Sequence, residues 1–254
     1  LVPAFTTFVL IPFGPDLVVD GRTIPLVVAD VETGVLLFLA LSSLAVYSLV
    51  MAGYASNNKF SLLGSIRASA QLISYELAMT ISVLAVVIPV NSFRLQDIVA
   101  WQQEHGWMFI PQFLGFLIFL IAAFAETNRL PFDLPEAESE LIAGFHTEYS
   151  AMRFALFFQS EYTAMAALSA LGVTLYFGGW SLPGIEFTGW LGAALGLATL
   201  LAKIAFCMAV YVWVRWTFPR FRYDQLMALG WKVLLPLAIL NLIGVSAATL
   251  AGWL

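Results

Sequence analysis

Long apolar runs separated by short polar segments dominate the chain. A helix that crosses a membrane needs about 20 mostly apolar residues. Six runs have about this length and a shorter one opens the chain: residues 30–53, 66–90, 107–125, 149–178, 190–216 and 233–254, and the partial run 1–13. The pattern predicts an all-α, polytopic transmembrane helical bundle, with six full spans and one partial span in a single transmembrane domain over residues 1–254.

The composition supports a membrane location and argues against a redox centre in this chain. Hydrophobic residues make up 61% and charged residues 11% of the 254 residues, whereas soluble domains carry about 25% charged residues. Cys207 is the single cysteine, and His105 and His146 are the two histidines. These residues are too few for an internal disulfide, a haem or an iron–sulfur cluster. We therefore expect any metal or redox centre to belong to a partner, and we expect no nucleic-acid partner.

Basic residues divide unequally between the two sets of loops. Lys and Arg concentrate in cytoplasmic loops of membrane proteins. One set carries eight basic residues and the other carries Arg22 and Arg94, the eight being Lys59, Arg67, Arg129, Arg153, Arg215, Arg220, Arg222 and Lys232. The larger set is predicted to face the cytoplasm.

Two far-side segments and the start of the chain have structural interpretations. Residues 18–24 contain the Asp20-Gly21 pair typical of a tight hairpin turn. Residues 94–106 place Leu95, Ile98 and Val99 on one helical face, which predicts an interfacial helix. The chain opens inside an apolar run, so we expect further residues before it, and the sequence has no internal repeat of the kind found in many transporters.

Three ionisable residues lie well inside predicted spans. Lys203, Glu76 and Glu161 each lie in a long apolar run. Lys203 is about 18 Å from the cytoplasmic end of its helix at 1.5 Å per residue, too far for its side chain to reach water there. We therefore expect a carboxylate or water beside it. Structural ion pairs among these groups are one interpretation, and proton or charge transfer is the favoured one.

The segment 126–150 is a predicted cytoplasmic loop with an unusual density of carboxylates. Arg129 stands against six acidic residues, Glu126, Asp133, Glu136, Glu138, Glu140 and Glu148. A helix cap accounts for Asp133 and Glu136 but not for the others. Apolar neighbours within the loop favour a segment tucked against protein, where clustered carboxylates can hold and pass protons. The alternative is a solvated acidic loop.

Three long motifs identify a family resemblance. AETNRLPFDLPEAESELIAGFHTEYSAMRFALFFQSEYTAM (residues 125–165) closely resembles the signature of the H-type membrane subunit of NADH-quinone oxidoreductase, the ND-one-type subunit of respiratory complex I. GYASNNKFSLLGSIRASAQLISYELAM (53–79) and RWTFPRFRYDQLMALGWK (215–232) agree with it. Family members carry a first span, a basic glycine-rich segment and an amphipathic helix before the region covered here, which gives eight spans in all.

The resemblance implies a function for the whole chain. Such a protein lies in the bacterial inner membrane or an equivalent energy-transducing membrane, contacts lipid, anchors the soluble arm and forms much of the entrance to the quinone chamber. Quinone is the substrate, and its electrons come from an iron–sulfur cluster in a soluble partner. The acidic loop and the buried carboxylates begin a polar path toward the proton-pumping subunits of the membrane arm.

The resemblance also implies residue roles, carried over by motif match. The relay and coupling residues would be Glu126, Arg129, Asp133, Glu136, Glu138, Glu140, Glu148, Glu76, Glu161 and Lys203. Arg67 and Asp224 would lie near the quinone chamber.

Other functions remain open at this point. The chain could be a quinone-free anchor of a related membrane-bound hydrogenase, a stand-alone ion transporter, or a purely structural anchor. The subunits that co-purify with the chain would distinguish the first alternative from complex I. A nickel–iron hydrogenase partner would indicate the hydrogenase anchor, and a flavin-bearing NADH module would indicate complex I.

Overall fold

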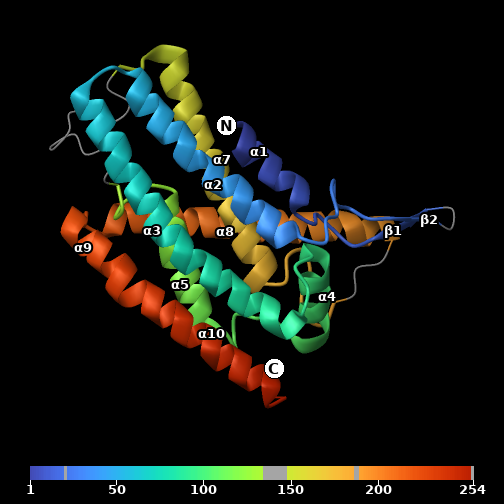
Figure 1. Ribbon diagram of the computed structural model, residues 1–254. Coiled ribbons are helices and arrows are strands. Elements are labelled where there is room, and N and C mark those ends of the chain that lie inside the picture. The colour runs from blue at the N-terminus through green and yellow to red at the C-terminus, as the bar shows by residue number, and fades with distance from the viewer. Residues whose placement is uncertain (20–21, 134–147, 186–188, 253–254) are drawn as a thin grey trace.

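A computed structural model describes residues 1–19, 22–133, 148–185 and 189–252 as a bundle of helices with a small β-hairpin at one end (Figure 1). The elements in chain order are α1 (Val2–Thr6), η1 (Thr7–Leu10), β1 (Leu17–Val19), β2 (Arg22–Ile24), α2 (Gly34–Ala55), α3 (Lys59–Val90), α4 (Leu95–His105), α5 (Phe113–Glu126), α7 (Ala151–Tyr176), α8 (Gly189–Thr217), α9 (Tyr223–Ala228), the π-helical η3 (Leu229–Leu234) and α10 (Leu235–Leu250).

The long helices confirm the predicted helical bundle, and their length and composition fit a membrane protein. Among the described residues, four helical segments are long and apolar enough to cross a membrane: α2, α3, α8 and the continuous helix Tyr223–Leu250. Helix α5 is apolar but has 14 residues, and α7 has 26 residues but carries Arg153 and Glu161. The predicted count of six full spans and one partial span therefore stays a prediction.

Helix α3 is the central element of the bundle, with α2, α5 and α10 packed along it. It begins at Lys59, earlier than residue 66, because the Asn58 side chain caps it by accepting a hydrogen bond from the Phe60 amide at 3.0 Å. Asn57, in the left-handed conformation, completes the short turn from α2. The extra residues of α3 bring Ser61 and Ser65 into the contact with α2, where both are fully buried.

The contact between α2 and α3 depends on Gly53. A Cβ atom at this position would lie 2.4 Å from Ser65 Cβ and 3.0 Å from the Ser61 carbonyl oxygen. We expect Gly53→Ala to lower the free energy of unfolding by about 1–3 kcal/mol through overpacking. The loss is measured as a lower temperature of thermal inactivation of the purified protein. Ser65→Gly in the same chain should restore the stability. Gly244→Ala is the matched control, since a Cβ there meets no atom within 4 Å; equal effects of the two alanines would refute the packing argument.

The far end of the bundle carries the hairpin and α4. Strand β1 pairs antiparallel with β2, Leu17 lying opposite Ile24, as the predicted hairpin requires; its predicted turn at residues 20–21 lies outside the described residues. Leu95, Ile98 and Val99 share one buried face of α4, as predicted. This face packs within the protein, and an interfacial position for α4 stays a prediction.

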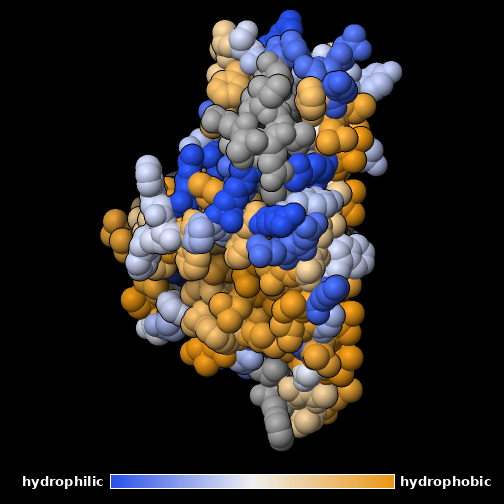
Figure 2. Space-filling view, turned by 90° about the vertical axis from the view of Figure 1, so that its left-hand side faces the viewer, coloured by the Kyte–Doolittle hydropathy of each residue, from blue (hydrophilic) through white to orange (hydrophobic). Residues whose placement is uncertain are grey.

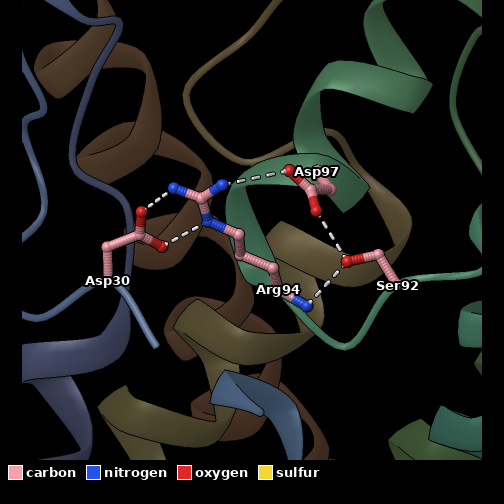
Figure 3. A network of polar contacts seen from close by, with 4 residues as sticks. All are labelled: Asp30, Ser92, Arg94 and Asp97. Carbon is pink, nitrogen blue, oxygen red and sulfur yellow. Dashed lines mark hydrogen bonds and ion pairs between the residues drawn. The ribbon is translucent and has the colours of Figure 1, made fainter. Parts of the chain in front are cut away.

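An ion-pair network joins the loop before α2 to the start of α4 (Figure 3). Arg94 binds Asp30 through both Nε, at 2.7 Å, and Nη2, and its Nη1 lies 3.9 Å from Asp97 Oδ1. Ser92 Oγ donates to Asp97 at 2.6 Å and accepts from the Arg94 amide at 3.2 Å. The loop before α2 is thereby fixed to the start of α4.

The two predicted sets of loops lie at opposite ends of the bundle. The α2–α3 turn and the starts of α7 and α9 lie at one end, and the hairpin and α4 lie at the other (Figure 1). Figure 2 shows hydrophilic residues over the upper part of the visible face and a broad hydrophobic surface below them. The assignment of the first end to the cytoplasm stays a prediction.

Candidate functional site

The first part of the acidic loop folds back onto the bundle. Helix α5 ends at Glu126, and Thr127, Asn128, Arg129 and Phe132 after it are all buried. Phe132 packs edge-on against Tyr75 of α3, with ring centroids 5.6 Å apart. This part of the loop is therefore shielded from water, as the apolar residues of the loop predicted.

Gln71 of α3 holds this segment in place. Its Nε2 donates to the carbonyl oxygens of Ala125 and Phe132, both at 2.9 Å, and lies 3.5 Å from Asn128 Oδ1. Sequence reasoning missed Gln71. The available signal was an amide side chain inside an apolar run, about one and a half helical turns before Glu76.

A buried ion pair joins the loop to α7. Arg129 Nη2 lies 3.5 Å from Glu161 Oε2, and the side chains are 6% and 14% exposed. The Arg129 guanidinium also lies 4.4 Å from the centre of the Tyr162 ring. The structure thus pairs one predicted intramembrane carboxylate with an arginine of the loop, whereas the sequence suggested a pairing with Lys203.

Two further carboxylates meet at adjacent serines of α2. Ser43 Oγ donates a hydrogen bond to Glu76 Oε1. The carboxyl group of Glu126 lies beside the Ser42 hydroxyl and interacts electrostatically with Glu76. Glu126 Oε2 is buried and has no hydrogen-bond partner among the described residues. The site therefore holds two interacting carboxylates, each beside a serine hydroxyl that also donates a hydrogen bond to the Leu39 carbonyl oxygen.

A cavity of about 80 Å³ opens beside Glu126, between α1, α2 and α7. Its walls are mostly apolar, and its polar lining groups are Thr7, Ser42, Ser48, Glu126 and Ser160. A cavity of this size has room for more than one water molecule, provided polar groups hold it. Glu126 is thus a buried carboxylate at the wall of a small, mostly apolar cavity with a few hydroxyl groups.

The remaining loop carboxylates differ in position. Asp133 is partly buried at the end of the described segment. Glu148 is exposed and accepts a hydrogen bond from Asn58 Nδ2 at 3.2 Å, so the expected shielding is wrong for this residue. Glu136, Glu138 and Glu140 lie outside the described residues.

Lys203 has a different environment from the one expected. Its Nζ donates to the backbone carbonyl oxygens of Phe177, Gly179 and Ser181, at 2.8, 2.9 and 2.6 Å. The expected carboxylate or water is thus replaced by backbone oxygens in the part of the chain that the structure describes. Its predicted role in proton transfer stays a prediction.

The two residues predicted near a quinone chamber lie in neighbouring elements. The Arg67 guanidinium of α3 lies 5.0 Å from the centre of the Tyr223 ring at the start of α9. Asp224 follows Tyr223 directly and lies 3.5 Å from Arg222 Nε. The fold therefore brings α3 and α9 together at this end of the bundle.

The described residues hold no group of three or more His, Cys, Asp or Glu side chains that could bind a metal ion. The carboxylates that meet here are Glu76 and Glu126, and Glu161 is engaged by Arg129. The chemistry that this arrangement offers is proton and charge transfer.

Comparison with known proteins gives consistent matches. The model of a family described as NADH dehydrogenase matches residues 1–246. The H subunit of NADH-quinone oxidoreductase from Protochlamydia amoebophila is 51% identical over 250 residues, which cover 98% of this chain and 74% of the relative. An H subunit of NADH-quinone oxidoreductase from Geobacter metallireducens is 51% identical over 253 residues, 100% of this chain and 72% of the relative. One from Geobacter sulfurreducens is 51% identical over 252 residues, 99% of this chain and 72% of the relative.

Proposed function

The chain belongs to the NADH dehydrogenase family, and from this premise we propose that it is the H subunit of an NADH-quinone oxidoreductase, in which it couples quinone reduction to proton translocation. It acts together with soluble partners that carry the iron–sulfur clusters and with other membrane-arm subunits. The names of the relatives favour this function over a quinone-free hydrogenase anchor.

The contact of Ser42 and Ser43 with Glu126 and Glu76 carries the proposal. Two carboxylates that interact in a poorly solvated site affect each other electrostatically, so a change of charge on one acts on the other. The two serines are adjacent on α2 and both donate to the Leu39 carbonyl oxygen, so the carboxylates that come from α3 and α5 lie at the same turn of α2. A negative charge that arrives with quinone reduction would shift protons along this pair.

The Arg129–Glu161 pair is proposed to modulate this path, because Arg129 lies in the segment that directly follows Glu126. Its charges are nearly buried, so solvent screens them little. A rearrangement of the loop that separates Arg129 from Glu161 would leave a negative charge inside the bundle and raise the proton affinity of the carboxylates near it. The loop carboxylates Asp133, Glu136, Glu138, Glu140 and Glu148 would then extend the path, as the family resemblance implies.

The quinone is proposed to approach the end of the bundle where Arg67 meets α9. Arg67 lies against Tyr223, next to Asp224, so a cation, an aromatic ring and a carboxylate adjoin one another there. Such groups can orient a quinone headgroup and respond to the charge that forms on its reduction.

Glu126→Gln and Glu76→Gln test the proposal in the intact complex in membrane vesicles. We expect both variants to assemble, because Gln keeps the shape and the hydrogen-bonding capacity of the carboxyl group. Coupled quinone reduction should fall by about 10²-fold, as for loss of a positioned proton-transfer group. The measurements are NADH-driven quinone reduction and proton uptake, each normalised to NADH oxidation with a soluble electron acceptor.

Glu104→Gln is the matched control, because Glu104 is exposed on α4. It should leave both rates at the wild-type level. Wild-type turnover and pumping in an assembled Glu76→Gln/Glu126→Gln double variant would contradict the proposal.

A further inference from the structure

The chain leaves α7 through a non-helical segment whose carbonyl groups are all satisfied. All eight carbonyl oxygens from Thr174 to Ser181 accept hydrogen bonds. Gln102 Nε2 donates to the oxygens of Thr174 and Leu175, and the Phe109 amide donates to that of Tyr176. Ser181 donates to Gly178, Thr199 Oγ1 donates to Trp180, and Lys203 Nζ donates to Phe177, Gly179 and Ser181. Non-helical backbone is tolerated at membrane depth only where protein groups satisfy it. This segment therefore meets the condition for lying inside the bundle.

Lys203 supplies three of these bonds from the middle of a candidate membrane span. It is the fifteenth of the 29 residues of α8. A lysine ammonium has three N–H donors and no acceptor, and here the three donors match three carbonyl oxygens. The Trp107 ring adds a cation–π contact at 5.3 Å. A neutral amine would have two donors, so loss of the proton would leave one carbonyl without its partner.

Two glycines shape the backbone so that the oxygens converge. Gly178 and Gly179 both have positive φ, +70° and +57°, a conformation that favours glycine. A Cβ on Gly178 would lie 2.7 Å from Ser181 Oγ, and one on Gly179 would lie 3.0 Å from Val99. The segment is therefore built to turn tightly between α4 and α8.

We infer that Lys203 is a positioning residue, a fixed ammonium clamp that holds the end of α7 against α8 through its three N–H groups. The positive charge also lies at the C-terminal end of α7, where the helix dipole favours a cation. The clamped segment directly follows Tyr176, the last residue of α7, whose hydroxyl lies 2.9 Å from Ser82 Oγ of α3. In this role the ammonium holds the backbone in place and is not a member of the proton path.

The test is the accessibility of the clamped segment in the membrane-bound complex. Ser181 is 2% exposed, so a cysteine at this position is labelled by a maleimide only when the clamped segment opens. The chain has one native cysteine, which Cys207→Ser removes. The labelling rate of the Cys207→Ser/Ser181→Cys variant therefore measures opening of the segment. We expect Lys203→Met to raise this rate by at least about tenfold, the factor that 1.4 kcal/mol represents. Lys203→Gln, with two N–H donors, should give a smaller rise. Lys232→Met is the control, because Lys232 is exposed, and should give none.

Small cations separate hydrogen bonding from charge. In Lys203→Ala, ethylammonium should slow the labelling, whereas tetramethylammonium, which has no N–H group, should not. The pH profile of quinone reduction should keep its shape in Lys203→Gln, since a residue that only holds the backbone transfers no proton in the reaction. Three results would each overturn the inference. The first is a wild-type labelling rate in Lys203→Met, and the second is an equal slowing of labelling by the two cations. The third is loss of one limb of the pH profile in Lys203→Gln. The labelling rate does not depend on turnover, so it tests the clamp independently of the proposed role in coupling.

Discussion

Arg129→Met is expected to lower the free energy of unfolding by about 3–5 kcal/mol, because it leaves the carboxylate of Glu161 buried without its arginine. The variant also loses the contact of the guanidinium with the Tyr162 ring. The measurements are the amount of assembled complex in membranes and its temperature of thermal inactivation.

A second variant separates loss of the pair from loss of one partner. Arg129→Met/Glu161→Met should recover most of the stability, because an apolar replacement of a whole buried ion pair is often neutral. The matched control is Arg222→Met, which removes an exposed pair whose side chains are 79% and 78% exposed; exposed pairs contribute at most about 1 kcal/mol. If Arg129→Met and Arg222→Met had equal effects, the buried pair would not be a determinant of the fold.

Gln71→Leu is expected to detach the start of the acidic loop. It leaves the carbonyl oxygens of Ala125 and Phe132 without the donor that now binds them at 2.9 Å, at a cost of about 1–3 kcal/mol for each group. Because these residues flank Glu126 and Arg129, coupled quinone reduction should fall together with stability. Hydrogen exchange of the backbone amides of residues 127–133 measures the detachment directly.

The control for this variant is Gln103→Leu, an exposed glutamine of α4. It should leave exchange in residues 127–133 and turnover unchanged. Unchanged exchange in Gln71→Leu would mean that other contacts, such as the bond from the Phe221 amide to the Pro131 carbonyl, suffice to hold the loop.

Most of the helices followed from apolar runs, whereas their boundaries did not. Helix α3 begins at Lys59, where Asn58 caps it, and Ser61 and Ser65 of its first turns are buried against α2; an apolar run does not distinguish a buried serine from an exposed one. The last helical segment begins at Tyr223 rather than at residue 233, since residues 223–232, which include Asp224, Gln225 and Lys232, form α9 and part of η3. Helix α5 begins at Phe113 rather than at 107, because residues 107–112 form a turn.

The candidate site was predictable as a set of residues but not as a set of contacts. The buried charges could be recognised because an ionised group in an apolar run is costly. The pairing of Arg129 with Glu161 depends on how the loop folds back, which no local pattern specifies. The partners of Lys203 were invisible for another reason: they are backbone carbonyls, which every residue has. Gly178-Gly179 was the available signal that the chain leaves the helix there.

Glu76 and Glu126 are proposed to change their protonation when quinone is reduced. Infrared difference spectroscopy of the intact complex tests this proposal most directly. Reduction of bound quinone in the wild-type complex should produce a carbonyl-stretch change of a protonated carboxyl group that shifts in heavy water. This signal should be lost or altered in Glu126→Gln and Glu76→Gln, and it should persist in Glu104→Gln. A difference spectrum in which wild type and both site variants show the same carboxyl signals would contradict the account.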